Sequence, residues 1–186
     1  MLTITETTIR DGVTFGEIGS FTPEDRIIKI GENYQIRSGS LIYFGVTIGD
    51  NLITGHNILI RENVKIGDNV LIGTNVVIDG NCIIGNHVRI QTGVYITAFT
   101  TIKDEVFMGP CSVTTNHKSM LYGDRQNLKG PIILEGARIG GNVTILPGIT
   151  IGKNAIVGGG SVVTKDVKEG TTVVGNPAEI IRYIKE

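Results

Sequence analysis

The sequence predicts an all-β protein whose chain winds into a three-sided solenoid of short parallel strands. Three observations support this class. Isoleucine returns every six residues, asparagine or glycine follows it three residues later, and the residue directly after it changes in a cycle of three. The period of an internal repeat fixes the architecture of a repeat protein, so we expect a triangular prism of about seven coils.

The isoleucine period predicts the strands. From Ile30, every sixth residue is isoleucine as far as Thr114, with Thr54, Met108 and Thr114 itself as the exceptions. A second buried position lies two residues earlier and is filled by Val46, Leu52, Ile58, Val64, Val70, Val76, Cys82, Val88 and Val94. Residues two apart in a strand point to the same side, so each hexad is expected to be a short strand with these residues in the core.

The turn position predicts a sharp corner after each strand. Three residues after each isoleucine slot, the chain carries Asn33, Gly39, Gly45, Asn51, Asn57, Asn63, Asn69, Asn75 and Asn81. Asparagine and glycine are the residues that adopt a positive φ angle at low cost. We therefore expect a left-handed backbone conformation at each of these positions.

The residue after each isoleucine slot indicates three sides. The first series is Gly31, Gly49, Gly67 and Gly85, the second is Arg37, Gly55, Gly73, Gln91 and Gly109, and the third is Tyr43, Arg61, Asp79, Thr97 and Thr115. Glycine is common in two series and absent from the third. Three hexads therefore form one coil of eighteen residues, and successive coils are expected to stack about 4.8 Å apart.

One insertion interrupts the repeat. The period resumes at Ile133 after thirteen extra residues, which predicts β-helix coils over 30–114 and 133–168 and an extruded loop over 115–132. A long polar loop in such a fold is usually there for binding or catalysis. We interpret 1–186 as one domain with an N-terminal cap over 1–29, and we expect a short C-terminal helix over 177–185 that docks through Ile180, Ile181 and Ile184.

The composition restricts the classes of molecule that the protein is expected to bind. Lys plus Arg is 17 and Asp plus Glu is 18, so no net field favours nucleic acid or an anionic membrane. The sequence contains no run of eighteen apolar residues and no basic segment leading into an apolar one, so we expect a cytoplasmic protein that acts on a small molecule. Cys82 is expected in the core and Cys111 at a corner, and neither pattern indicates a thiolate nucleophile.

The candidate catalytic residue is His117, at the start of the extruded loop. A loop histidine can act as a general base near neutral pH. The alternative is that His117 fills the turn position, as His87 does. His56 is also expected to be a corner residue, in a region where Asp50, Glu62 and Asp68 are expected to be exposed.

Gln91 replaces glycine in its series, and Gly109 lies one coil further on. An amide beside bare backbone suits a carbonyl or a sugar hydroxyl, although an exposed glutamine is also ordinary. Lys165 and Arg182 near the end of the chain suit a phosphate, with simple solvation as the alternative.

Four stretches resemble the hexapeptide-repeat acyltransferases: "IGDNVLIGTNVVI", "VFMGPCSVTTNH", "IGGNVTILPGITIGKNAIVGGGSVVTKDV" and "VVGNPAEII". Within that family the chain is similar to galactoside and maltose O-acetyltransferases and to N-acetyltransferases of nucleotide-linked amino sugars. The resemblance implies a left-handed parallel β-helix, acetyl-CoA as co-substrate, and a homotrimer with its sites between neighbouring subunits.

The resemblance also implies a reaction and its residues. It implies transfer of the acetyl group of acetyl-CoA to a hydroxyl or amino group of a sugar or nucleotide-linked sugar. The family's general base falls on His117, and its active-site asparagine falls on Gln91. Its acetyl-CoA contacts map to Gly109, Gly141, Gly159, Thr164, Lys165 and Arg182, while a position that is often basic is Glu179 here.

Two other functions stay open at this point. A γ-class-like carbonic anhydrase also uses a left-handed β-helix, with three histidine ligands. Here His56, His87 and His117 fall on three different sides of the predicted prism, so no metal site is expected. A non-catalytic trimeric scaffold is the second alternative, because the repeat alone guarantees only a stable prism.

Overall fold

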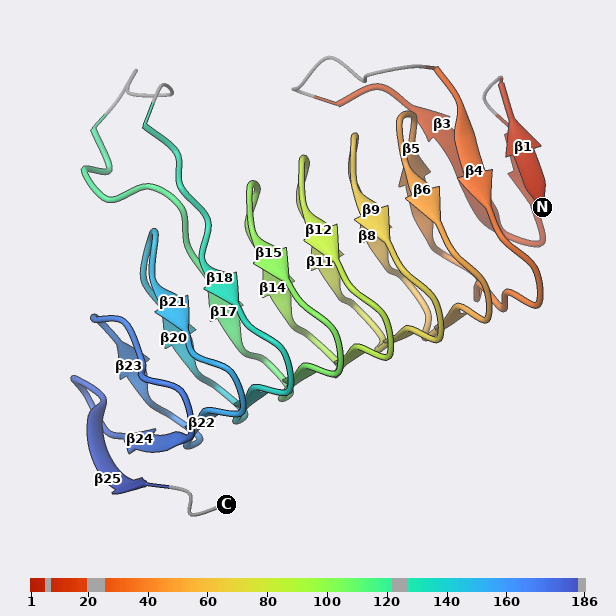
Figure 1. Cartoon of the computed structure of the whole chain (residues 1–186). Helices are drawn as coiled ribbons and strands as arrows, with labels where there is room; N and C mark the ends of the chain where they lie inside the picture. Colours follow the sequence, from red (N-terminus) through yellow and green to blue (C-terminus); the bar gives the residue numbers. More distant parts are fainter. Residues whose placement is uncertain (6–7, 20–25, 122–126, 184–186) are drawn as a thin grey trace.

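A computed structural model of the chain describes residues 1–5, 8–19, 26–121 and 127–183. The chain winds into a stack of triangular coils whose two ends lie at opposite ends of the stack (Figure 1). The described residues contain β-strands and no helix, and hence no helix long and apolar enough to cross a bilayer. The architecture confirms the predicted all-β, three-sided solenoid and is consistent with a left-handed β-helix.

Three sheets form the sides of the prism. Sheet A contains, in spatial order, β1 (Leu2–Ile4), β4 (Ile28–Ile30), β6 (Thr47–Ile48), β9 (Lys65–Ile66), β12 (Ile83–Ile84), β15 (Thr101–Ile102), β18 (Ile132–Ile133) and β21 (Thr150–Ile151). Sheet B contains β2 (Thr8–Arg10), β3 (Val13–Glu17), β5 (Leu41–Tyr43), β8 (Leu59–Ile60), β11 (Val77–Ile78), β14 (Tyr95–Ile96), β17 (Val113–Thr114), β20 (Thr144–Ile145) and β23 (Val162–Val163). Sheet C contains β7 (Ile53–Thr54), β10 (Leu71–Ile72), β13 (Arg89–Ile90), β16 (Phe107–Met108), β19 (Arg138–Ile139), β22 (Ile156–Val157), β24 (Thr171–Val174) and β25 (Glu179–Tyr183).

The register follows the eighteen-residue coil. Ile72 pairs with Ile90, and Ile90 pairs with Met108, in parallel along sheet C. Across the insertion, Ile102 of β15 pairs with Ile133 of β18, so the loop adds residues at one corner without skipping a side. The N-terminal end of the stack departs from this parallel pairing, because β1 pairs antiparallel with β4 and β2 pairs antiparallel with β3.

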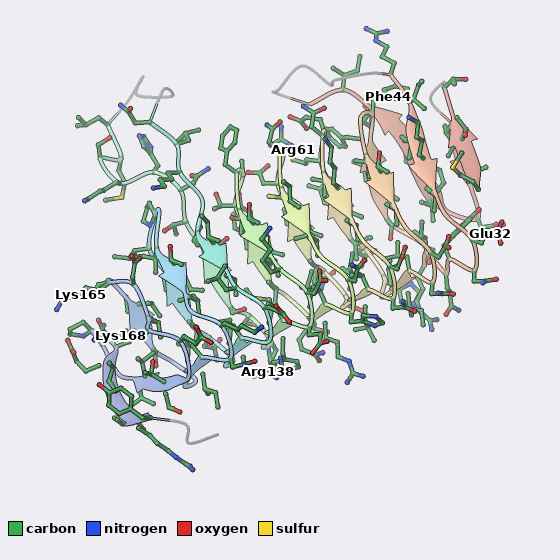
Figure 2. All side chains as sticks on the ribbon, in the orientation of Figure 1. Glu32, Phe44, Arg61, Arg138, Lys165 and Lys168 are labelled. Carbon is green, nitrogen blue, oxygen red and sulfur yellow. The ribbon has the colours of Figure 1, made fainter. Side chains whose placement is uncertain are left out.

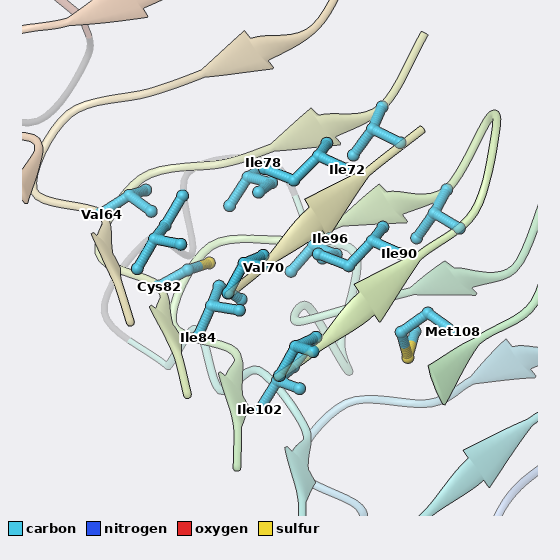
Figure 3. Packing of buried hydrophobic residues seen from close by; sticks show 14 of the residues in the cluster. Val64, Val70, Ile72, Ile78, Cys82, Ile84, Ile90, Ile96, Ile102 and Met108 are labelled. Atoms are coloured by element: carbon cyan, nitrogen blue, oxygen red, sulfur yellow. The ribbon is translucent and has the colours of Figure 1, made fainter. Parts of the chain in front are cut away.

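The predicted core is confirmed. The isoleucines of the repeat point into the prism, where Ile72, Ile78, Ile90, Ile96 and Ile102 are fully buried (Figure 3). The residues two positions earlier, including Cys82, lie beside them in the same interior. Each large aliphatic side chain buried in this way contributes roughly 1.5–3 kcal/mol, which explains how a prism without helices holds together.

The corners also follow the prediction, and they carry a feature beyond it. All nine predicted turn positions have positive φ angles, for example 57° at Asn69 and 78° at Gly39. The asparagine side chains then bond from coil to coil, with Asn51 Nδ2 donating to Asn69 Oδ1 at 3.1 Å. The same residue therefore satisfies the backbone angle of one coil and binds the next.

The predicted C-terminal helix is wrong. The turn expected at residues 175–177 is present, but it leads into strand β25, which pairs antiparallel with β24. Ile180 and Ile181 are exposed and do not dock, while Ile184 and the predicted helix end lie outside the described residues. The edge of β24 offers unpaired backbone groups, and the sequence EIIRY is rich in residues that favour strands, so β pairing prevails over a short helix.

Candidate active site

The inserted loop is anchored at its base between two coils. It starts after Thr114 at the corner that links sheet B to sheet A, which we call the loop corner and which includes residues 61–64, 79–82 and 97–100 of earlier coils. Asn116 Nδ2 donates to the carbonyl of Ala98 at 3.2 Å, and Thr115 N and Oγ1 both donate to the carbonyl of Ile145 at 3.0 Å. The loop base is therefore held by the coil before it and the coil after it.

The returning end of the loop closes the same base. Lys129 N donates to the carbonyl of Asn116 at 2.8 Å, and Gly148 N donates to the carbonyl of Lys129 at 2.9 Å. A Cβ atom on Gly130 would lie 2.5 Å from the backbone of Phe99 and Thr100, so the chain passes directly over the preceding corner. The loop therefore projects from the edge of the prism on a fixed neck (Figure 1).

His117 is the first residue beyond that neck. Its side chain is half-buried, and its Nε2 atom lies 3.2 Å from Ser119 Oγ. The equivalent turn positions of the loop corner have positive φ at Asn63, Asn81 and Phe99, but His117 is not among the described residues with positive φ. The turn requirement therefore does not explain His117, and its role as a base stays a prediction.

The glycines predicted to contact acetyl-CoA share a second corner. This glycine corner links sheet C to sheet B, and it contains residues 73–76, 91–94, 109–112, 140–143 and 158–161. A Cβ on Gly109 would lie 2.5 Å from backbone atoms of Gly140 and Gly141, so packing between coils already requires this glycine. For Gly141 and Gly159 the nearest atoms would be 3.2 and 3.3 Å away, and neither residue has positive φ.

Gln91 lies in the same corner. Its backbone N–H donates to the carbonyl of Met108 at 2.9 Å. Gln91 is half-buried and stacks between Gly73 and Gly109, as the eighteen-residue spacing predicts. A Cβ atom on Gly73 would lie 2.6 Å from the Gln91 carbonyl carbon, so packing between coils requires glycine on both sides of Gln91.

The last predicted contacts lie near the C-terminal end of the stack. Thr164 and Lys165 follow β23 at the loop corner, and Arg182 lies in β25 with its side chain exposed. Lys165 Nζ is 3.8 Å from Glu179 Oε1, and both side chains are largely exposed. The acidic residue at a position that is often basic in the family therefore faces a lysine of the predicted site.

One chain does not bring the two halves of the predicted site together. His117 extends from the loop corner, whereas Gln91, Gly109, Gly141 and Gly159 line the glycine corner. These corners lie at opposite edges of sheet B, since the chain enters that sheet at one and leaves it at the other. A site that contains both His117 and the residues of the glycine corner therefore needs one of these two groups to come from a second chain.

A buried charge network lies on the loop corner and was not predicted. Glu62, expected to be exposed, is fully buried, while Asp50 and Asp68 are exposed. Arg61 donates to both Glu62 carboxylate oxygens, at 3.2 and 3.0 Å, and to Asp79 Oδ1 at 2.8 Å. The covering residue is Gly19, where a Cβ would overlap Glu62 Oε2, so burial of this carboxylate depends on the N-terminal segment.

Tyrosines complete the Arg61 network. The Tyr95 hydroxyl donates to Asp79 Oδ2 at 3.2 Å, and the Arg61 guanidinium lies 5.8 Å from the centre of the Tyr43 ring. Burial and the negative charge of Asp79 raise the pKa of Tyr95. Partial burial lowers the pKa of Arg61, but the charges of Asp79 and Glu62 outweigh it, so that pKa lies above its usual value. The third residue series, which lacks glycine, was the available signal for this network.

The three histidines lie at three different corners. His56 is exposed with Nδ1 3.2 Å from Ser38 Oγ, and His87 is exposed with a φ of 56°, as expected of corner residues. Within the part of the chain that the structure describes, no three His, Cys, Asp or Glu side chains are grouped so as to hold a metal ion. Cys82 is buried, which raises the pKa of its thiol to about 12 and disfavours a thiolate there.

Comparison with known proteins identifies the repeat. The model of the family "Bacterial transferase hexapeptide (six repeats)" matches residues 45–80, 63–98 and 130–165. Residues 45–98 and 130–165 therefore match the hexapeptide repeat of that family. The matches cover coils on both sides of the inserted loop, so the same type of repeat is present before and after the insertion.

Its curated relatives match over part of their length. An unconfirmed acetyltransferase of Staphylococcus aureus (strain Mu50) is 40% identical over 74 residues, which are 38% of this chain and 37% of the relative. Serine acetyltransferase 2 of Arabidopsis thaliana is 42% identical over 88 residues, covering 44% of this chain and 27% of the relative. The chain therefore matches well under half the length of these relatives.

Solved structures share the fold. A hexapeptide-repeat-containing acetyltransferase of Vibrio cholerae O1 biovar eltor, complexed with acetyl coenzyme A, is 36% identical with a TM-score of 0.50, over 57% of this chain and 62% of that one. A UDP-N-acetylglucosamine acyltransferase of Bacteroides fragilis is 22% identical with a TM-score of 0.67, over 95% of this chain and 74% of that one. The second likeness concerns the fold alone.

Proposed function

We propose that this protein transfers the acetyl group of acetyl-CoA to a hydroxyl or amino group of a sugar or nucleotide-linked sugar. The repeat family and the similarity to an acetyltransferase solved with acetyl coenzyme A support the donor and the reaction class. The observation that carries the proposal is the anchored loop, which holds His117 outside the turn pattern of the repeat.

The glycine corner supports the donor site. At positions 141 and 159, neither a positive φ angle nor a severe clash with the backbone of the next coil requires glycine, whereas such a clash explains Gly109. The remaining physical reason for glycine is close approach by a ligand. The pantetheine arm of acetyl-CoA is a thin chain that suits such an approach, with Gln91 beside the reacting end and Arg182 toward the other. Thr164 and Lys165 lie at the loop corner with His117, so they would approach the same acetyl-CoA from the neighbouring chain.

The reaction needs no covalent intermediate on the protein. His117 takes a proton from the acceptor hydroxyl or amine as its lone pair attacks the thioester carbonyl carbon. Backbone N–H groups near the reacting carbonyl stabilise the oxyanion that forms. The carbon–sulfur bond then breaks, the acetyl group stays on the acceptor, and the departing thiolate takes the proton from the imidazolium.

The separation of the two corners supports sites shared between chains. His117 of one chain would meet the glycine corner of its neighbour in a closed assembly, which we propose to be a homotrimer. Three equivalent sites then form around the threefold axis. The acceptor binds where the loop of one subunit reaches the adjacent prism.

The first test is the His117→Ala variant. Release of free thiol from acetyl-CoA, followed over a panel of sugars and amino sugars, is expected to fall by roughly 10²–10⁴ in turnover. Lys118→Ala removes the exposed neighbour in the same loop and is the matched control, expected to keep wild-type turnover. A folded His117→Ala variant with unchanged turnover refutes the role of His117.

The second test addresses the shared site. His117→Ala and Gln91→Ala proteins are each expected to be weakly active alone. After the subunits are mixed and exchanged, some interfaces combine an intact His117 with an intact Gln91, and activity should return in part. No recovery, with exchange verified by mass spectrometry, contradicts a site shared between chains.

A further inference from the structure

A small cavity opens on the outer face of sheet C, away from His117. Its volume is about 280 Å³, and it is lined by His87, Arg89, Glu105, Val106, Phe107 and Arg138. Arg89, Phe107 and Arg138 are register partners on the consecutive strands β13, β16 and β19. The three residues therefore share the outer face of three consecutive coils, with Phe107 between Arg89 and Arg138 in the register, and Arg138 lies along the lower edge of the prism in Figure 2.

The two arginines have no ion-pair partner in the described part of the chain. Among the described residues, no carboxylate forms an ion pair with Arg89 or Arg138, whereas Arg61 is paired with both Glu62 and Asp79. Counting Arg89 and Arg138 against Glu105, the cavity carries 2 − 1 = +1 with His87 neutral, in a chain whose net charge is −1. An uncompensated pair of guanidinium groups is a recognition element for phosphate or carboxylate.

Arg138 is also held in place. Its Nη1 atom donates to the carbonyl of Glu105 and to the carbonyl of Gly136, the latter at 2.8 Å. These acceptors are neutral main-chain groups, so they fix the guanidinium without cancelling its charge. The remaining N–H donors of Arg138 make no hydrogen bond within the described part of the chain.

Phe107 gives the cavity an apolar floor. Its side chain is half-buried, and the adjacent Val106 is buried in the core. Strands two apart in a parallel sheet lie about 9.6 Å from each other, a gap that two arginine side chains can span to reach one anion. The volumes of ligand pockets start at about 300 Å³, so a cavity of this size suits a ligand with one ring and one anionic group.

We infer that this cavity binds a small phosphorylated compound with a planar ring, at a site separate from the proposed acyl-transfer site. The phosphate lies between Arg89 and Arg138, with His87 as a further polar neighbour at the rim. The ring stacks on Phe107, since aromatic faces stack on planar rings of many kinds. The carboxylate of Glu105 at the rim disfavours ligands that place a second anion there.

Adenosine 5′-monophosphate is a suitable probe, measured by isothermal titration calorimetry on the full chain. We expect Arg89→Gln to weaken binding by about 10-fold or more, because it removes charge-assisted hydrogen bonds. Phe107→Leu keeps an apolar side chain and is expected to weaken binding of the nucleotide while leaving binding of inorganic phosphate unchanged. Lys29→Gln removes one exposed charge from sheet A and is the matched control, expected to bind as wild type.

The Arg89 side chain is exposed, so Arg89→Gln is expected to fold normally, as circular dichroism can verify. Gly141→Ala alters the proposed donor site and should leave nucleotide binding intact if the sites are separate. Undetectable binding of both probes, binding that Arg89→Gln leaves unchanged, or loss of nucleotide binding in Gly141→Ala would each overturn the inference.

Discussion

Alanine at three glycines of the glycine corner should separate packing from ligand binding. At Gly109 the new Cβ would be 2.5 Å from backbone atoms of the next coil, about 1 Å inside the optimal separation of carbon atoms. The coils must shift around the Gly109 N–H to Ile139 carbonyl bond, which is 2.8 Å long. Overpacking of this kind costs about 1–3 kcal/mol, and each kcal/mol lowers the melting temperature by about 2–4 °C in a chain of this size.

Gly141→Ala and Gly159→Ala should behave differently. Their nearest neighbours would be 3.2 and 3.3 Å away, so shifts of a few tenths of an ångström suffice. Alanine also restricts the unfolded chain, which stabilises the fold by about 0.4–1 kcal/mol and offsets that small cost. We expect melting temperatures near wild type, together with a rise of about 10-fold or more in the Kd for acetyl-CoA, where the added methyl group blocks close approach.

Thermal unfolding followed by circular dichroism and titration with acetyl-CoA are the two assays. The reasoning predicts opposite rankings: Gly109→Ala loses the most stability, whereas Gly141→Ala and Gly159→Ala lose affinity without losing stability. A Gly109→Ala protein as stable as wild type refutes the packing argument. Wild-type affinity in both other variants refutes their assignment to the donor site.

Three further predictions concern stability. Asn69→Ala should lower the free energy of unfolding by about 2–3 kcal/mol, because alanine resists the φ of 57° and loses the bond from Asn51, whereas Asn69→Gly should cost only about 1 kcal/mol. Glu62→Gln should cost about 2–4 kcal/mol in urea unfolding, because it removes the charge of a fully buried carboxylate and leaves the partly buried Arg61 without that partner. Burial raises the pKa of the Cys82 thiol from 9.0 to about 12, so the folded chain holds this proton after the unfolded chain has lost it. The free energy of unfolding should therefore fall by up to about 1.4 kcal/mol per pH unit between about pH 9 and pH 12.

Each of these has an internal control. Equal losses for Asn69→Ala and Asn69→Gly argue against the backbone explanation. Glu32 pairs with the N-terminus at 3.7 Å with both groups largely exposed, so Glu32→Gln should change stability by less than about 1 kcal/mol, and a loss equal to that of Glu62→Gln contradicts the role of burial. Cys82→Ala should reduce the alkaline slope and leave the part above about pH 10 that the raised pKa of Tyr95 contributes, and an unchanged slope assigns the effect to other groups.

Part of the candidate site was accessible from the sequence. The departure of residues 115–132 from the repeat located the loop, and the residue series located the corner of Gly109, whereas Gly141 and Gly159 were assigned through the family resemblance. The loop and the glycine corner lie apart in the fold because the hexads that carry them end at different corners of the prism. The cavity around Arg89 and Arg138 had no linear signal, because its residues belong to three coils and become neighbours only through stacking.

The sequence by itself determined the period of six, the inward row of isoleucines and the positive φ angles of the asparagine corners. These properties are local, since each depends on a few adjacent residues and on the conformations that their side chains permit. Tertiary structure alone decided that Glu62 is buried under the N-terminal segment, and that residues 179–183 pair as a strand with β24. Both outcomes depend on which distant surface or strand edge is available to the segment, and the residues of the segment alone do not contain that information.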